Sequence, residues 1–336
     1  MSIFPHTRLR RTRQYTWLRD MVADVSLSPK DLVLPLFIRE DHDERIIQNL
    51  PGVERYALSE LPKIAEKALI LGIPAIALFP KTPEALKDEK GGEAFNPHNL
   101  VCEGLSLLKK HFGNDLGLIA DVALDPYTLN GHDGLVKEGR VDNDGTVDVL
   151  IKQALIQAQA GADILAPSDM MDGRIGWIRR ALDDQGYHHT LLMSYAAKYA
   201  THFYGPFRNA VGAGALTSMD VPELRHKKTY QMDYRRRHEA LFEVSQDIRE
   251  GADMLMVKPA TLMLDILYRI KSTTHMPTFA YHVSGEYACL RLMGQQGLLN
   301  YEDALLEILY GIKRAGADGI FTYGALDAAR VLKESL

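Results

Sequence analysis

Short runs of apolar residues recur along the chain, and stretches with apolar side chains at helical spacing separate most of them. Eight such runs lie at residues 32–38, 75–79, 117–122, 163–167, 190–195, 253–258, 278–283 and 318–323. Runs this short without polar alternation are typical of strands buried on both faces of a parallel sheet. Eight strands alternating with helices over about 300 residues predict an α/β fold, a (β/α)8 TIM barrel.

One phrase repeats before three of these runs. Ala-Gly-Ala-Asp at 160–163, Glu-Gly-Ala-Asp at 250–253 and Ala-Gly-Ala-Asp at 315–318 each follow a helical pattern. The glycine fits the left-handed residue that closes a helix. A doubly wound open sheet, the rival fold, would normally carry a phosphate-binding glycine loop after its first strand. The first run is followed by REDHD instead, and no G-x-G-x-x-G or Walker sequence occurs, so we favour the barrel.

Two segments fall outside the alternating pattern. Residues 1–30 form a basic arm in which Tyr15 and Trp17 are expected to be buried, so we assign 31–336 to the barrel domain. Residues 204–232, between the fifth and sixth strands, combine glycines, prolines and basic side chains. A connection this long predicts a lid or binding loop, which we call the lid segment.

Composition narrows the functional classes. The 39 basic and 44 acidic residues give a net charge of −5, so we expect no nucleic-acid partner. No apolar run approaches the roughly 20 residues of a membrane span, and the first twenty residues carry five arginines without an apolar core, unlike a signal peptide. Two cysteines build no disulfide framework. We therefore expect a cytoplasmic protein without a membrane partner.

Two lysines follow neighbouring strands. Lys258 closes the apolar run MLMV, and Lys198 lies three residues beyond Tyr195 at the end of the fifth run. Adjacent strands are about 5 Å apart, and two ammonium groups about 6 Å apart repel by roughly 2.8 kcal/mol, or about two pKa units. One lysine should then be neutral near pH 7 and able to attack a carbonyl. The alternative is an exposed or salt-bridged lysine.

Carboxylates gather after the third strand. Asp121, Asp125 and Asp133 flank a segment that also contains His132. Such a group suits a hard cation, or a carboxylate that orients an amine. Asp-Pro and Asp-Gly are also ordinary turn dipeptides, and the spacing leaves these readings open.

Hydroxyl and basic side chains could hold a carboxylate substrate. Ser168, Ser284 and Tyr323 follow the fourth, seventh and eighth strands, and Arg208 and Lys227 lie in the lid segment. A hydroxyl at a strand end is more often a cap, so only their convergence at one rim supports binding.

The motifs at these strand ends resemble the porphobilinogen synthase family, also called the δ-aminolevulinic acid dehydratases. The resemblance spans nearly the whole chain and is carried by TRLRR, LPLFI, PGVER, DVALDPYT, APSDMMDGRIG, SYAAKYA, YGPFR, TYQMD, GADMLMVKP and VSGEY. It implies a barrel whose arm wraps a neighbouring subunit, usually in a homo-octamer. It also implies a hydro-lyase of heme biosynthesis that condenses two 5-aminolevulinate molecules, with loss of two waters, into porphobilinogen.

The resemblance also implies roles for individual residues. Lys258 would form a Schiff base with the substrate that becomes the propionate side, and Lys198 with the other. Ser284 and Tyr323 would hold the first carboxylate. The second would be held by Arg208, Lys227 and Gln231, with Arg225 and Lys228 as rivals to Lys227. Asp121 and Ser168 would orient the first substrate's amino group.

Metal use is expected to follow the magnesium-responsive relatives. Zinc-dependent relatives carry three cysteines where this chain has Ala123, Asp125 and Asp133, so we expect no zinc and no organic cofactor. Glu243 matches the ligand of a stimulatory magnesium between subunits, close to an arm arginine such as Arg10 or Arg11. Whether Asp125 and Asp133 hold a metal stays open.

Two alternatives remain at this point. A class I aldolase on the same barrel would need one lysine only, and would tolerate loss of Lys198. A catalytically inactive barrel could serve as a scaffold, although the intact lysines and carboxylate-binding groups speak against this.

Overall fold

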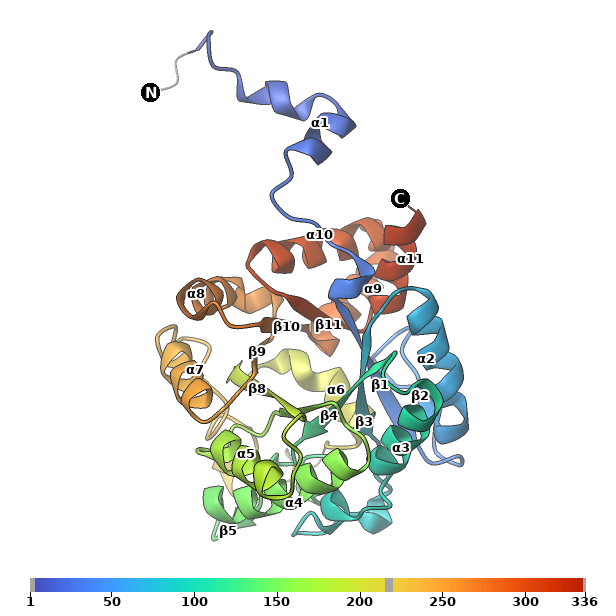
Figure 1. Cartoon of the computed structure of the whole chain (residues 1–336), viewed down its shortest axis with the longest axis vertical. Coiled ribbons are helices and arrows are strands. Elements are labelled where there is room, and N and C mark those ends of the chain that lie inside the picture. Colours follow the sequence, from blue (N-terminus) through green and yellow to red (C-terminus); the bar gives the residue numbers. More distant parts are fainter. Residues whose placement is uncertain (1–3, 215–219, 335–336) are drawn as a thin grey trace.

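The computed structural model describes residues 4–214 and 220–334. Within them, eight parallel strands form one closed barrel, because the first strand pairs with the last, and this confirms the predicted (β/α)8 fold (Figure 1). The barrel strands, in chain order, are β1 (Leu32–Arg39), β3 (Ala75–Pro80), β4 (Gly117–Val122), β7 (Ile164–Pro167), β8 (Leu191–Lys198), β9 (Met254–Lys258), β10 (Thr278–His282) and β11 (Gly319–Thr322).

Helices surround the barrel, and the described residues form three further short strands besides the eight of the barrel. Strand β2 (Arg55–Ala57) pairs with the end of β1, while β5 (Val136–Lys137) and β6 (Arg140–Val141) form a small hairpin after β4. The helices are α1 (Thr16–Met21), α2 (Leu61–Ile70), α3 (Leu100–Phe112), α4 (Asn143–Gln159), α5 (Arg174–Asp184), α6 (Gly205–Val211), α7 (Glu239–Arg249), α8 (Leu264–Thr274), α9 (Ser284–Gln295), α10 (Tyr301–Arg314) and α11 (Ala325–Glu334).

The barrel strands are buried on both faces, as their continuous apolar runs predict. Along β1, Leu34 and Leu36 pack outward in the layer beneath the helices, whereas Val33 and Phe37 join a separate cluster inside the barrel. This alternation follows from the period of two in a strand. The inner cluster is rich in aromatic rings toward the carboxyl ends of the strands, where the candidate site lies.

One strand extends further than the sequence pattern suggests. Strand β8 was expected to end near Tyr195, but it continues to Lys198 through a register shift between Ser194 and Ala197. The polar and aromatic residues there interrupt the apolar run without ending the hydrogen-bonded ladder. Lys198 therefore lies on the strand itself and not in the loop beyond it.

The repeated Gly-Ala-Asp phrase has a structural role at the opposite rim. Its glycines all adopt positive φ, as predicted. The aspartate side chains accept backbone N–H groups from the preceding barrel strand: Asp163 from Leu118 (3.0 Å), Asp253 from Leu192 (2.8 Å) and Asp318 from Thr278 (2.7 Å). Each copy thus ties the start of one strand to its neighbour.

The arm projects away from the barrel (Figure 1). Tyr15 and Trp17 stack on each other, with ring centroids 6.0 Å apart, but both are exposed. The expectation that they are buried is wrong within a single chain, where α1 has no buried residue. Among the described residues, no helix has the length and apolar character needed to cross a bilayer.

Candidate active site

The two candidate lysines are neighbours at the carboxyl ends of adjacent strands. Lys198 of β8 and Lys258 of β9 are register partners, which places their Cα atoms about 5 Å apart. Both side chains are buried. The charge of Lys198 is also one of the groups that shift the pKa of Lys258. The structure therefore brings the two amines into one chamber, as the strand order predicts.

Aromatic rings surround the amine of Lys258. Its Nζ lies 4.3 Å from the ring centroid of Tyr281, and 5.1 to 5.3 Å from those of Tyr204, Phe207 and Tyr195. Burial in this cage, followed by repulsion from Lys198, lowers the pKa of Lys258 to about 7. Near neutral pH a large share of this amine is therefore unprotonated, which a nucleophilic lysine requires.

Lys198 has a polar environment instead. Its ammonium group donates to the backbone carbonyl of Ser168 and lies 3.5 Å from Oδ2 of Asp133. Burial alone would raise the pKa of Asp133, but the charges of Lys198 and Lys227 outweigh it and hold the pKa below its usual value. Asp133 is therefore a buried, ionised counter-ion.

The remaining two aspartates differ from Asp133. Burial, followed by the charge of Asp125, raises the pKa of Asp121 to about 7, and burial also raises the pKa of Asp125. Oδ1 of Asp121 is shielded from solvent and has no hydrogen-bond partner among the described residues. Asp121 can therefore accept a proton or a hydrogen bond near neutral pH.

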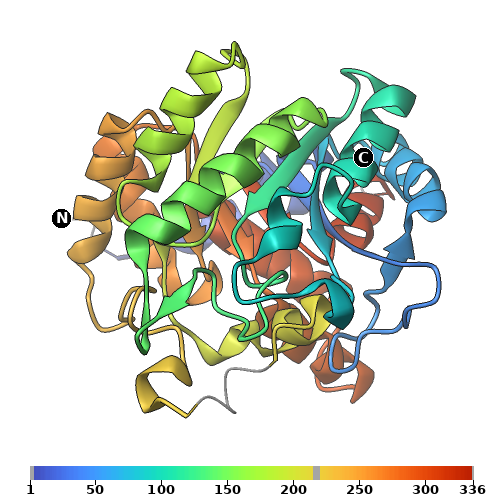
Figure 2. The ribbon, with the colours of Figure 1, turned by 90° about the horizontal axis from the view of Figure 1, so that it is seen from below.

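Side chains of the lid segment contribute to the same chamber. Figure 2 shows the ribbon of this segment, in yellow, along the same edge of the barrel as the green loop that follows β4. Nζ of Lys227 lies 2.9 Å from Oδ1 of Asp133 and 3.4 Å from Oδ2 of Asp125, and Nε2 of Gln231 donates to Oδ2 of Asp133 at 3.2 Å. Burial would lower the pKa of Lys227, but the two aspartates outweigh it and raise that pKa.

The two rivals to Lys227 lie elsewhere. Arg225 and Lys228 are exposed, whereas Lys227 is buried against the carboxylates.

The loop after β4 further anchors the lid segment, since His132 contacts the hydroxyl of Tyr230 (3.0 Å) and the carbonyl of Leu224 (2.9 Å).

The hydroxyl groups expected at the seventh and eighth strands each contact a residue of the cage around Lys258. Ser284 begins α9, and its Oγ donates to the carbonyl of Phe203 (3.2 Å) and accepts the backbone N–H of Phe207 (3.0 Å), a residue of that cage. The hydroxyl of Tyr323 contacts that of Tyr281 at 3.1 Å, and Tyr281 belongs to the cage around Lys258.

Arg208 is half-buried on α6. Its charge acts on Tyr204, Lys227 and Tyr230, which places it on the same side of the chamber as the later part of the lid segment.

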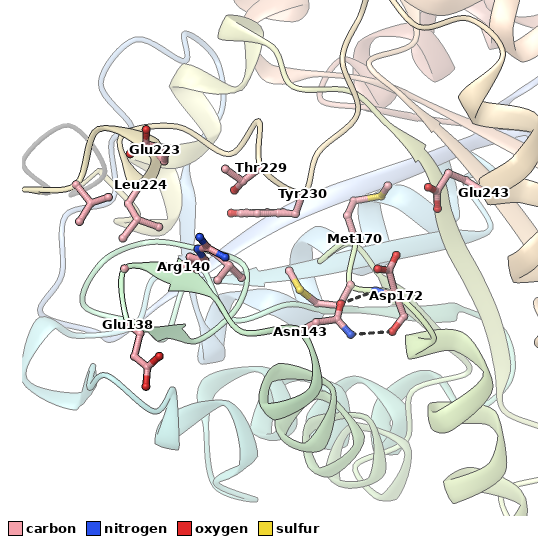
Figure 3. Close-up of a pocket in the computed structure, with 14 residues that line it drawn as sticks. Glu138, Arg140, Asn143, Met170, Asp172, Glu223, Leu224, Thr229, Tyr230 and Glu243 are labelled. Atoms are coloured by element: carbon pink, nitrogen blue, oxygen red, sulfur yellow. Dashed lines mark hydrogen bonds between the residues drawn. The ribbon is translucent and has the colours of Figure 1, made fainter.

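Glu243 is separate from this chamber. It lies on α7 beside a cavity of about 800 Å³ that Asp172, Arg140 and Tyr230 also line. Figure 3 shows Glu243 and Asp172 at one end of this cavity, away from Glu138 of the β5–β6 hairpin. Burial, and then the charge of Asp247, raise the pKa of Glu243.

Sequence reasoning missed two parts of the site. The aromatic cage was not expected, although the motif YGPFR and the tyrosines near strand ends carried a signal. The second is a buried ion network that joins Arg174 of α5 to Asp169, which follows β7, and to Asp247 of α7. Nε of Arg174 lies 3.4 Å from Asp169, and its Nη1 lies 3.7 Å from Asp247.

The fold and these side chains define the class of protein: a (β/α)8-barrel enzyme with paired buried lysines at the carboxyl ends of its strands. The family model for delta-aminolevulinic acid dehydratase matches residues 6–331. The chain therefore belongs to the delta-aminolevulinic acid dehydratase family. This confirms the predicted family and the predicted function as a porphobilinogen synthase, a hydro-lyase of tetrapyrrole biosynthesis.

Individual relatives agree with this assignment. A delta-aminolevulinic acid dehydratase of Bradyrhizobium diazoefficiens is 50% identical over 327 residues, covering 97% of this chain and 91% of the relative. A chloroplastic one of Glycine max is 46% identical, covering 97% and 78%. The crystal structure of the Toxoplasma gondii enzyme in complex with porphobilinogen matches with a TM-score of 0.94 and 42% identity, covering 98% of this chain and 92% of that chain.

Proposed function

We propose that this porphobilinogen synthase joins two molecules of 5-aminolevulinate through imines on both Lys258 and Lys198. Each imine would form when a neutral amine attacks the substrate ketone and releases water. The iminium acidifies the neighbouring C–H bond and activates the carbon for attack by an amine. The observation that carries this proposal is the register pairing of two buried lysines, one of which has a pKa of about 7.

The surroundings of each lysine suit different substrate groups. Ser284 and Tyr323, beside the cage of Lys258, would hold the first carboxylate. Arg208, Lys227 and Gln231 would hold the second. Because Arg225 and Lys228 are exposed, we assign the second carboxylate to Lys227.

The aspartates have distinct proposed roles. Asp121, with Ser168 beside it, would orient the first substrate's amino group and take up its proton, since the pKa of Asp121 is about 7. Asp125 and Asp133 already hold Lys227 between them. We therefore assign these two carboxylates to charge balance and to attachment of the lid segment.

Magnesium would bind at Glu243. Burial raises the pKa of Glu243, and the negative charges of Asp247 and Asp172 act in the same direction, so a cation would be stabilised beside these carboxylates. The described residues contain no group of three or more His, Cys, Asp or Glu side chains arranged to hold a metal. Water molecules, which magnesium retains readily, would complete its shell. The ion would supply positive charge near an arm arginine, such as Arg10 or Arg11, of a neighbouring subunit.

Magnesium stimulation is directly measurable. Added magnesium should raise porphobilinogen formation, and Glu243→Gln should remove that increase, while a zinc chelator should leave the activity intact. Inhibition by the chelator that only zinc reverses would reject the proposed metal use.

The chain would assemble as a homo-octamer through its arm. The exposed, stacked Tyr15 and Trp17 supply an apolar surface for a second copy. Mass measurement in solution, with a variant lacking residues 1–30 as the comparison, tests this. The cytoplasmic location and the lack of a nucleic-acid partner stay predictions.

Borohydride trapping with 5-aminolevulinate tests the two imines. Reduction followed by peptide mapping should place adducts on both Lys258 and Lys198. An adduct on Lys258 alone would favour a single-lysine aldolase, and no adduct on either lysine would favour an inactive scaffold.

A further inference from the structure

Helix α6 carries two side chains of the chamber but is too short to be stable alone. It spans seven residues, or about 10 Å, and isolated helices of this length are marginal in water. Phe207 belongs to the cage around Lys258, and the charge of Arg208 acts on Lys227. The orientation of both side chains must therefore come from contacts that the helix makes with the rest of the barrel.

Two buried cations hold the C-terminal end of this helix. Nε and Nη2 of Arg55 donate to the carbonyls of Ala210 (2.8 Å) and Asn209 (2.9 Å), and Nζ of Lys87 donates to the carbonyl of Gly212 (2.7 Å). The last carbonyls of a helix lack partners within the helix and carry partial negative charge. Charged donors are therefore well matched to them, and burial strengthens the interaction.

These cations connect α6 to distant parts of the chain. Arg55 begins β2, and its Nη1 also donates to the carbonyls of Glu44 (3.0 Å) and Ile46 (3.2 Å). Lys87 follows a short 3-10 helix, Glu84–Leu86, and its Nζ also contacts Glu84 at 2.6 Å. Both side chains are buried, so water does not compete for these bonds.

The N-terminal end of α6 has a separate attachment. The backbone N–H of Phe207 donates to Oγ of Ser284 at 3.0 Å. Ser284 is itself a proposed ligand of the first substrate, so it fixes this end of the helix relative to Lys258. The cations at the other end then determine the direction in which α6 leaves that point.

We propose that Arg55 and Lys87 are positioning residues for the second substrate molecule. By holding the C-terminal end of α6, they keep Arg208 where it binds the second carboxylate. This inference rests on the proposed role of Arg208. Both residues would thus affect substrate binding from other segments of the chain, Arg55 from β2 and Lys87 from the loop after β3.

Lys87→Met tests the proposal, because it removes the charged donor and keeps the length of the side chain. The apparent KM for 5-aminolevulinate should rise about tenfold or more, since small displacements of a binding group cost up to about a hundredfold, while kcat changes less. Lys333→Met is the matched control. Nζ of Lys333 donates to the carbonyl of Ile70, the last residue of α2, at the other end of the barrel, and its loss should leave KM within about twofold.

A double variant separates this role from general destabilisation. If Lys87 acts through Arg208, Lys87→Met should add little to the KM increase that Arg208→Ala causes alone, because coupled residues are not additive. Lys87→Gln, which keeps an uncharged donor, should give a smaller KM increase and serves if the methionine variant does not fold. An unchanged KM in both Lys87 variants, or additive effects, would overturn the proposal.

The proposed function is checked separately. Wild-type enzyme that neither forms porphobilinogen nor traps an adduct would reject the two-imine function. A normal wild type with an unchanged KM in the Lys87 variants would reject the positioning role alone.

Discussion

Lysine–aspartate pairs occur at both ends of the barrel, and they differ in burial. At the amino ends of the strands, Lys271 and Asp318 lie 2.7 Å apart, with 29% and 44% of their side chains exposed. At the carboxyl ends, Lys227 and Asp133 lie 2.9 Å apart, with 4% and 1% exposed. The residue types and the distances are nearly the same, but the pair at the carboxyl ends is shielded from water, and there, against the effect of burial, the lysine charges lower the pKa of Asp133 while the aspartates raise that of Lys227.

The comparison shows that the surroundings of an ion pair determine its role. An exposed pair contributes about 0–1 kcal/mol, because water screens it. A buried pair gains little net stability, since desolvation offsets its attraction, but loss of one partner leaves an uncompensated charge that costs about 3–5 kcal/mol. The exposed pairs at the amino ends therefore link neighbouring strands, whereas the buried pairs at the carboxyl ends hold charges that cannot be removed singly without a large cost in stability.

The largest expected effect comes from the lysines of the buried end. Lys258→Ala and Lys198→Ala should each lower porphobilinogen formation by at least about a thousandfold, because each removes a proposed nucleophile. The product is measured as a pyrrole with an acidic aldehyde reagent. Lys271→Ala, at the exposed end, should retain nearly full activity. Retention of a tenth of the activity in either active-site variant would contradict two essential lysines.

The second prediction concerns stability at the buried end. Asp133→Asn should lower the free energy of unfolding by about 3–5 kcal/mol, since it leaves Lys198 and Lys227 without their shared counter-ion. Denaturant unfolding of both proteins measures the difference. A loss below about 1 kcal/mol would show that Asp133 is not a buried ionic partner.

The third prediction concerns pH. Because the pKa of Lys258 is lowered to about 7, its neutral fraction falls nearly tenfold for each pH unit below that value. We therefore expect kcat/KM to rise with pH and to level off above about pH 7. This rise reflects the coupled titration of several groups in the chamber, Asp121 among them. A limb above pH 9 would instead indicate an ordinary, solvated lysine.

The smallest effect is expected at the exposed end. Asp318→Asn removes the charge opposite Lys271 but keeps an oxygen that can accept the N–H of Thr278. The unfolding free energy should fall by less than about 1 kcal/mol, and kcat and KM should not change. A loss as large as that of Asp133→Asn would remove the distinction between the two ends.

Much of the fold could be predicted from the sequence because its signals are local. A strand buried on both faces needs a continuous apolar run, and a helix closed by glycine has a recognisable end. Lys258 could be placed at the rim since it directly ends such a run. Lys198 was harder, because the irregular pairing between Ser194 and Ala197 depends on the neighbouring strand.

The finer arrangement of the site depends on contacts between distant segments. The pairing of Lys227 with Asp133, and the approach of Phe207 to Lys258, join residues from different loops. No local pattern encodes such distances. The arm shows the same limit, since Tyr15 and Trp17 are both exposed in the described part of a single chain.

Closure of the barrel has a consequence for how the protein is made. The first strand meets the last through Leu32 with Ile320 and Val33 with Phe321, residues almost the whole chain apart. During synthesis, Leu32 and Val33 of β1 have no partner on this edge until β11 emerges, and an unpaired edge can recruit other chains. Nascent copies can therefore associate through this edge until β11 has been made, and truncation within β11 would leave the edge unpaired.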